Sequence, residues 1–228
     1  MLVDVDDVPG EDLELRLDEA VLQQPPSGLS GLIRIGEPNV FDAVDLARVS
    51  ATPVAPEVEL LLAEHNFTVV RLPVSVRPTE RATVKFLAVE VTLEAPGSTA
   101  TCWSLEPDRV DEEIKVATTV GITSKLSVQL AEVNGSNQKN SEYVIRQPRV
   151  LAYQVGCPDP AWEFTPTPGR RLEGVQLLHL VVKSPRGAAW TGKVGIRVGV
   201  HTGGWPWRLR AVRRDGNQSV AQFTHPAH

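Results

Sequence analysis

An alternation of apolar and polar residues runs from Val116 to Leu130 and predicts one arm of a β-hairpin. Successive side chains of a strand point to opposite faces, so the pattern is typical of a strand with one apolar face and one polar face. The positions between the apolar ones are small or polar. The predicted apolar face consists of Val116, Thr118, Val120, Ile122, Ser124, Leu126, Val128 and Leu130.

Residues 134–140 follow this arm and have the composition of a turn, since Asn, Gly and Ser suit the backbone conformations that turns need. A second extended segment then reaches Val155. We therefore interpret Val116 to Val155 as one long hairpin and expect it to form the centre of the fold. The acidic run from Asp111 to Glu113 is expected to be a solvated strand or loop that leads into this hairpin.

Two earlier stretches, Phe67 to Val76 and Thr83 to Leu93, are also typical of strands. Residues 77–81 between them have the length and composition of a hairpin loop, so we expect the two strands to pair with each other. Pro73 has no backbone N–H to donate, which favours an edge strand or a bulge at that point.

The C-terminal half contains further strands. Val175 to Lys183 has few polar interruptions, so we expect both of its faces to be buried. Lys193 to His201 alternates strictly, and glycines on its second face leave room for a close neighbour. Trp162 and Phe164 are expected to face the same side of a short strand. The predicted buried face of the Lys193 to His201 strand is Val194, Ile196, Val198 and Val200.

The first 56 residues contain only short apolar runs separated by prolines. We predict that residues 1–56 form an N-terminal arm of mixed elements without a core of its own, packed on a main domain over residues 57–228. Many short strands with turn signals between them, and no long amphipathic helices, predict an all-β fold. The predicted architecture is an antiparallel two-sheet sandwich of immunoglobulin-like or jelly-roll type, with its strand order left open.

The net charge of −5 is unevenly distributed, with acidic residues gathered near the start and basic residues near the end. This asymmetry fits either a docking surface or two ends that neutralise each other. The first ten residues lack the features of a secretory signal, and no apolar run reaches the roughly 18 residues that a membrane-spanning helix needs. We therefore expect a cytoplasmic protein.

Cys102 and Cys157 are the only two cysteines. In a reducing compartment two separate thiols are favoured over a disulfide, although pairing stays open because both residues lie at the ends of predicted strands. No further ligands stand at the spacing of a zinc site, so no metal and no cofactor is predicted.

No catalytic or phosphate-binding motif occurs in the sequence. His179 lies within an apolar strand, which favours a core histidine over a catalytic base. We expect no enzymatic activity and predict no catalytic residue. A hydrolase with an unrecognised site is retained as an alternative.

A strip of tryptophan and arginine near the C-terminus is the best sequence candidate for a binding surface. It comprises Trp205, Trp207, Arg208, Arg210, Arg213 and Arg214. Arginine pairs with phosphates and stacks on aromatic rings, so an anionic ligand is one possibility here, although no nucleic-acid-binding motif accompanies the strip. In the alternative interpretation, the tryptophans cap the sandwich and the arginine stems cover apolar surface.

These observations favour a non-enzymatic interaction or structural module. It would bind a protein partner, or a second copy of itself, through a sheet face, an edge strand or the strip just described. The alternative is a membrane-active or pore-forming protein, because an amphipathic hairpin of this length can pair with copies of itself to line a pore. Arg146, Pro148 and Arg149 interrupt the second arm of the hairpin and weigh against that alternative.

Overall fold

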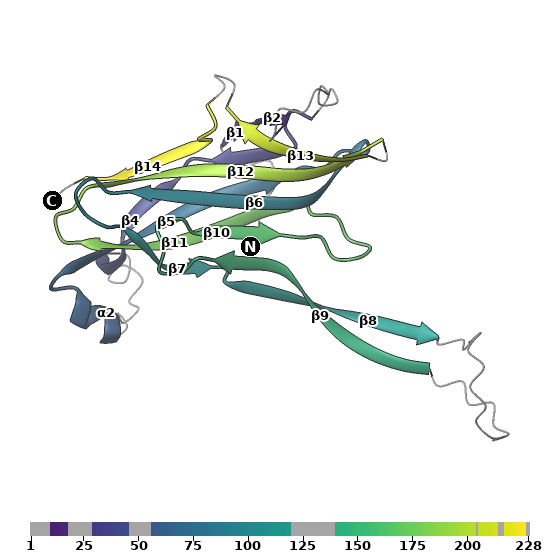
Figure 1. Cartoon of the computed structure of the whole chain (residues 1–228), viewed down its shortest axis with the longest axis horizontal. Coiled ribbons are helices and arrows are strands. Elements are labelled where there is room, and N and C mark those ends of the chain that lie inside the picture. Colours follow the sequence, from purple (N-terminus) through teal and green to yellow (C-terminus); the bar gives the residue numbers. More distant parts are fainter. Residues whose placement is uncertain are drawn as a thin grey trace, which may run out of the picture.

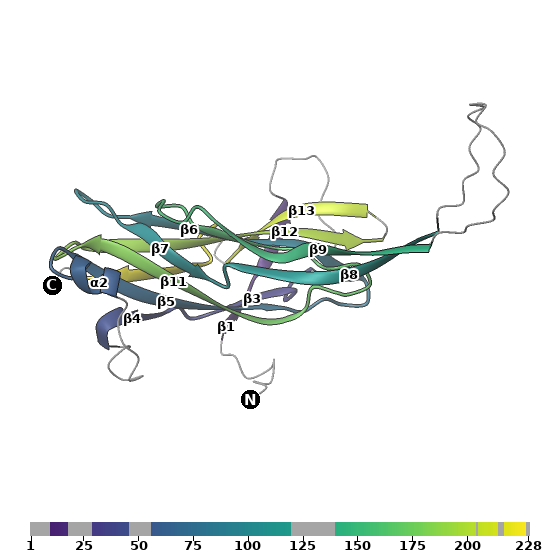
Figure 2. The same ribbon diagram turned by 90° about the horizontal axis from the view of Figure 1, so that it is seen from below.

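A computed structural model describes residues 10–17, 29–45, 56–119, 140–203, 205–213 and 217–226. Two antiparallel β-sheets pack face to face across an apolar core (Figure 2). The predicted all-β two-sheet sandwich is therefore confirmed. Several elements of the N-terminal part, which the sequence predicts only as mixed elements, are strands as well.

The first sheet has six strands in the order β1-β3-β5-β11-β7, and β4 also pairs with β5. Inward positions of β5 and β11 are buried at every second residue, as expected for a sheet with one face in the core. The strands of this sheet are β1 (Gly10–Asp12), β3 (Ile33–Gly36), β4 (Asn39–Asp42), β5 (His65–Val76), β7 (Thr101–Glu106) and β11 (Gly174–Pro185).

The second sheet has eight strands in the order β2-β13-β12-β6-β10-β9-β8, and β14 also pairs with β12. A short helix, α2 (Pro56–Leu61), precedes β5, and no helix among the described residues is long and apolar enough to cross a bilayer. The strands of this sheet are β2 (Glu14–Leu17), β6 (Ala82–Glu94), β8 (Arg109–Thr119), β9 (Asn140–Tyr153), β10 (Ala161–Phe164), β12 (Trp190–Thr202), β13 (Trp205–Val212) and β14 (Ala221–His225).

The core confirms two predictions about which residues face inward. Trp162 and Phe164 of β10 point the same way and are almost completely buried. The predicted apolar face of β12 is also in the core, with Val194, Ile196, Val198 and Val200 all buried. Period-two alternation alone was sufficient to identify these positions.

The prediction that residues 67–76 and 83–93 form a hairpin is wrong. β5 belongs to the six-stranded sheet and β6 to the eight-stranded sheet, so the loop between them crosses the sandwich. Each strand has an apolar face, and the two faces meet across the core instead of the strands meeting edge to edge. Pro73 lies in an interior strand, but β3 pairs with β5 over residues 74–76 and β4 over residues 68–71, so Pro73 falls between the two.

The expectation that Val175 to Lys183 is buried on both faces is also wrong. Burial alternates along β11, and Leu177 is 45% exposed. The apolar residues at outward positions of this strand contribute to the outer face of the six-stranded sheet and not to a second core layer.

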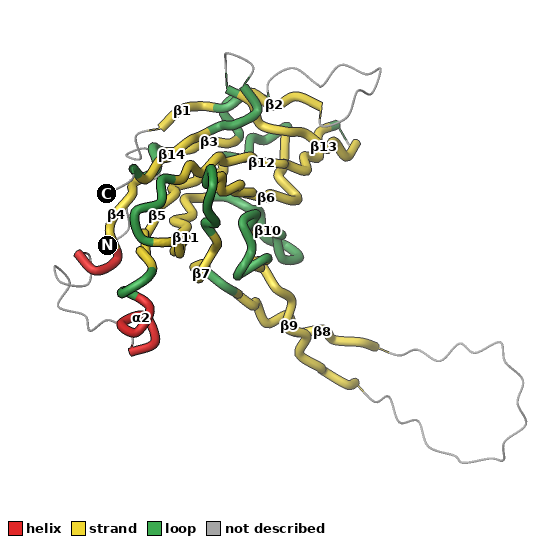
Figure 3. The backbone as a smooth tube through the Cα atoms, turned by 60° about the vertical axis from the view of Figure 1, so that its left-hand side comes forward, coloured by secondary structure: helices red, strands yellow, loops and turns green. Residues whose placement is uncertain are grey.

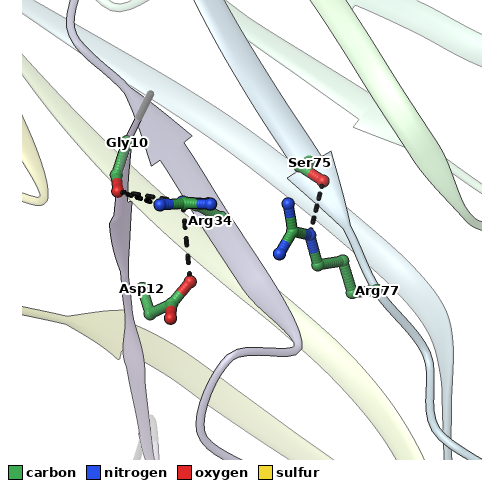
Figure 4. A network of polar contacts seen from close by, with 5 residues as sticks. All are labelled: Gly10, Asp12, Arg34, Ser75 and Arg77. Carbon is green, nitrogen blue, oxygen red and sulfur yellow. Dashed lines mark hydrogen bonds and ion pairs between the residues drawn. The ribbon is translucent and has the colours of Figure 1, made fainter. Parts of the chain in front are cut away.

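The N-terminal strands add to both sheets, since β1, β3 and β4 extend the first sheet and β2 pairs with β13. Arg34 of β3 donates from Nε and Nη2 to the carbonyl oxygen of Gly10 on β1, at 2.9 and 2.7 Å, and its Nε lies 3.6 Å from Asp12 Oδ1 (Figure 4). Arg77, the residue after β5, donates from Nε to Ser75 Oγ of that strand at 3.4 Å. The domain boundary at residue 56 stays a prediction.

Candidate functional site

The most distinctive feature of the molecule is a two-stranded ribbon that leaves the sandwich. We define the ribbon as residues 111–119 of β8 and residues 140–148 of β9. Figures 1 and 3 show these two strands running out beyond the ends of their neighbours. In the register of the ribbon, Ile114 lies opposite Ile145 and Val116 lies opposite Tyr143.

The predicted hairpin exists, but its position and pairing differ from the prediction. β8 begins at Arg109, so the acidic run 111–113 lies inside the strand, and Val116 pairs with Tyr143 and not with a residue near Val155. The hairpin also lies at the edge of the eight-stranded sheet and not at the centre of the fold. An edge strand tolerates charged residues, which explains why an acidic run can belong to it. Residues 120–139, with most of the predicted first arm, lie outside the described part of the chain.

A β-bulge marks the base of the ribbon. Val110 pairs with Val150 and Asp111 with Pro148, which leaves Arg149 as an extra residue on β9. A bulge bends its strand and increases the local twist, so it redirects the ribbon away from the sheet. Pro148 has no N–H to contribute to a ladder, and it occupies this irregular point where regular pairing is interrupted anyway.

Both outer edges of the ribbon are open within the described part of the chain. β10 pairs with β9 only along Val150–Tyr153, so residues 140–148 of β9 have β8 as their one neighbouring strand. Among the described strands, β8 is the last of its sheet and pairs with β9 alone. An open edge presents backbone N–H and C=O groups that can pair with a strand from another chain.

The tryptophan and arginine strip is divided between two faces of β13. Trp207 pairs with Val200 and packs against the core, whereas Arg208 and Arg210 pair with residues on the outward face of β12. Arg210 donates to Gln218 at 3.2 Å. The structure therefore does not bring Trp207 and the two arginines to one surface.

The remaining members of the strip are placed only in part. Arg213 forms an ion pair with Glu11 at 2.9 Å, which links the basic end of the chain to its acidic start. The backbone of Trp205 pairs with Thr202, and its side chain lies outside the described part of the structure. Arg214 lies outside the described residues.

The outer face of the six-stranded sheet carries aromatic rings next to cations. Trp103 contacts Phe67 edge to face with ring centroids 5.3 Å apart, and Lys183 lies 5.4 Å from the Trp103 ring centroid. Arg71 lies similarly over Phe41, at 5.6 Å. Such contacts stabilise modestly at exposed positions, on the order of 0.5–1 kcal/mol each.

His179 lies on the same outer face, between Arg71 of β5 and Glu106 of β7. Burial lowers the pKa of His179, the charge of Arg71 lowers it further, and Glu106 acts in the opposite direction. The histidine thus lies in a cross-strand row between a cation and an anion. Across the described ranges, no three His, Cys, Asp or Glu side chains gather where they could hold a metal ion.

Comparisons with known proteins identify no family. No family model matches the chain, and no curated protein matches its sequence. Among solved structures, the chain is similar to the Clostridium perfringens NetB toxin in the membrane-inserted form. That similarity covers 71% of this chain and 82% of the toxin chain, with a TM-score of 0.36 and 8% sequence identity. A likeness this distant says nothing about function.

Sequence reasoning found the hairpin but missed its two open edges. The predicted alternation begins at Val116 and overlaps β8 only over residues 116–119, and it does not indicate the register with β9. Because β10 ends at Phe164, residues 140–148 of β9 have no second neighbour among the described strands, and no local pattern in β9 indicates this.

Proposed function

We propose that this protein is a β-sandwich interaction module that binds a second copy of itself through the ribbon. The observation that carries the proposal is the pair of open edges, one on β8 and one on β9. Strand addition at such an edge gives affinity through main-chain hydrogen bonds and requires no side-chain pocket.

The geometry favours a contact between different edges of the two copies. The strands of the ribbon are antiparallel, so the β8 edge of one copy can receive the β9 edge of the next copy and continue an antiparallel ladder. Such a contact is heterologous, and each added copy again presents one open edge of each kind. Assemblies of this type close into rings when the rotation between copies permits, and otherwise grow into fibres.

Charge along β8 points to the outer part of the ribbon as the contact. Residues 111–113 are all acidic, and charged side chains along an edge discourage the addition of another strand, so the base of the ribbon is the less suitable part of the β8 edge. From Val116 to Thr119 the strand is uncharged, and β-branched residues dominate it. Uncharged β-branched segments at an edge are the ones that pair most readily.

A second candidate function is membrane insertion of the associated ribbons. The register sets Pro148 opposite Asp111, at the base, so the ribbon beyond it contains no proline in its described part. The proline that weighed against insertion would therefore remain outside the bilayer. In the sequence, Ile114 to Leu130 contains no acidic residue and exceeds the 9–11 residues that a strand needs to cross a membrane. The cytoplasmic location and an anionic ligand at the strip stay predictions.

The principal experiment removes the ribbon. A variant in which a short Gly-Ser linker replaces residues 112–147 should remain monomeric in sedimentation velocity at concentrations where the full chain associates. The matched control is the double variant Arg208→Ala/Arg210→Ala, which should associate like the full chain. Association of the shortened variant, or loss of association in the control alone, would move the interface away from the ribbon.

Proline substitution tests whether backbone hydrogen bonds form the contact. Adjacent residues of an antiparallel strand direct their N–H groups to opposite edges. Of Ala117→Pro and Thr118→Pro, one therefore removes a donor to β9 and the other a donor at the open edge. In the open-edge variant the association constant should fall at least tenfold while the circular dichroism spectrum is unchanged. If neither variant lowers the association constant, strand addition is wrong.

Dye leakage from anionic and neutral liposomes tests the second candidate. The full chain should release dye and the variant lacking residues 112–147 should not. Absence of leakage by an associated full chain would exclude membrane insertion and leave the interaction module standing.

A further inference from the structure

The two cysteines meet at the seam between the two sheets, although 55 positions separate them in the sequence. Cys102 belongs to β7 of the six-stranded sheet, and Cys157 lies in the segment between β9 and β10 of the eight-stranded sheet. The N–H of Cys102 donates to the carbonyl oxygen of Cys157 at 2.9 Å, and the N–H of Gly156 donates to the carbonyl oxygen of Cys102 at 2.7 Å.

This arrangement has the hydrogen bonds of a glycine bulge. Gly156 has a φ of 87°, and Gly156 and Cys157 together oppose the single residue Cys102. Cys157 is therefore the residue that faces Cys102 across the seam. Facing residues in antiparallel pairs have Cα atoms about 4.5–5.5 Å apart, which falls within the range of about 4.4–6.8 Å that disulfides span.

The segment that holds Cys157 is anchored on both sides. Besides the bonds to Cys102, the carbonyl oxygens of Pro158 and Pro160 accept hydrogen bonds from Leu93 and Val91 of β6, at 2.8 and 2.9 Å. The seam thus fixes the backbone of Cys157 relative to both sheets. The two thiols are free in this structure, with Cys102 buried and Cys157 exposed.

We propose that Cys102 and Cys157 form an intramolecular disulfide by exchange with a low-molecular-weight disulfide such as oxidised glutathione. The thiolate of Cys157 attacks one sulfur of glutathione disulfide, forms a mixed disulfide and releases one glutathione thiolate. Cys102 then loses its proton, attacks the sulfur of Cys157 and releases the second glutathione. The two cysteine thiols are oxidised, and one glutathione disulfide is reduced to two glutathione molecules.

The order of these steps follows from the surroundings of the two thiols. Burial raises the pKa of Cys102 to about 11, while the backbone hydrogen bond from Gly156 lowers it and the charge of Cys157 raises it. Since the thiolate is the attacking species, only roughly one Cys102 in a thousand is reactive at pH 8. The exposed Cys157 reacts first, and Cys102 reacts once its partner sulfur is held beside it.

The bond would join β7 of the six-stranded sheet to the segment between β9 and β10 of the eight-stranded sheet. The closed loop of residues 102–157 contains all of β8 and β9. A single bond would therefore tie together the two ends of the stretch that carries the ribbon. The inference does not depend on association of the ribbon, because the cysteines lie outside the residues that the shortened variant lacks.

Intact mass spectrometry of the full chain after incubation with oxidised glutathione tests the proposal. The chain should lose two hydrogens, retain no glutathione, and yield on non-reducing digestion a single peptide pair that links Cys102 to Cys157. The Cys102→Ser variant should stop at the glutathione adduct of Cys157, and Cys157→Ser should react at least tenfold more slowly.

A stable glutathione adduct on the unsubstituted chain, or a disulfide between two chains, would overturn the proposal. The digest of the unsubstituted chain decides the question even if a variant folds poorly, since it needs no substitution. Thermal unfolding provides an independent readout: the oxidised chain should unfold at a higher temperature than the reduced chain, because the cross-link restricts the unfolded state.

Discussion

The sandwich body and the ribbon are built from the same kind of strand, yet within the described residues they differ in the number of neighbouring strands. In the body, the inward face of each sheet meets the other sheet, and residues such as Trp162 and Ile196 are completely enclosed. The ribbon continues two strands of the eight-stranded sheet past the last residues of β10, their neighbour. A two-stranded hairpin alone is marginally stable in water, so the ribbon depends on the body, whereas the body does not depend on the ribbon.

This difference separates the residues that maintain the fold from those available for contacts with other molecules. Changes in the body should lower the free energy of unfolding and leave association unchanged in any variant that still folds. Removal of residues 112–147 should instead abolish association and change the unfolding free energy by less than about 1 kcal/mol.

The largest loss of stability is expected at the centre of the body. Trp162→Ala should lower the unfolding free energy by about 3–5 kcal/mol, because it leaves a large cavity between the sheets. Trp162→Phe should cost less, since the buried indole N–H that it removes has no hydrogen-bond partner among the described residues. Urea denaturation measures both. A loss below 1 kcal/mol for the alanine variant would mean that the core does not hold the sheets together.

A close contact between β12 and β14 should give the next largest effect. A Cβ atom on Gly192 would overlap ring atoms of Phe223, so Gly192→Ala should cost about 1–3 kcal/mol through overpacking. Gly195→Ala is the matched control on the same strand, because its Cβ would meet only Glu90 Oε2, at 3.9 Å. Equal melting temperatures for the two variants would contradict the packing of Phe223 against β12.

The outer face of the eight-stranded sheet should contribute little. Arg197 donates from Nε to Glu90 Oε1 at 2.8 Å, but both side chains are more than a third exposed. Solvent screens such pairs, so Glu90→Gln should cost about 0.5 kcal/mol or less, and less still in high salt. A salt-independent loss above 1 kcal/mol would show that this face is covered in solution, for example by another copy.

The smallest effect is a dependence of stability on pH at His179. Its pKa in the folded protein is below the ordinary value of 6.5, so the unfolded chain binds the proton more readily. The contribution of neutral His179 is therefore complete above pH 6.5 and declines as the pH falls toward the folded-state pKa. His179→Gln should flatten the unfolding free energy between pH 7 and pH 5; an unchanged slope would assign it to other groups.

Particular residues show how far the sequence could go. The alternation at Val194 to Val200 and the pair Trp162 and Phe164 identified core faces correctly, because a strand with one dry side must alternate. The same reasoning overestimated burial at Leu177, since an apolar residue on a strand can equally lie on an outer face. It also paired β5 with β6, because loop length cannot distinguish a hairpin from a connection between sheets.

The candidate site depended even more on tertiary structure. The composition of the C-terminal strip suggested a surface, but the register of β13 put Trp207 against the core and Arg208 on the outside. The open edges of the ribbon arise from where β10 ends, and the position of Cys157 opposite Cys102 arises from a bulge between segments that are distant in the chain.

The sequence by itself therefore determined the all-β class, the alternating core faces and the existence of a hairpin, because these follow from side-chain period and local turn chemistry. Only the tertiary structure decided which strands are neighbours, where β8 lies, which edges are open and that Cys102 faces Cys157. The physical reason is that strand pairing uses backbone groups common to all residues, so the choice of partner is decided by the packing of the whole sandwich.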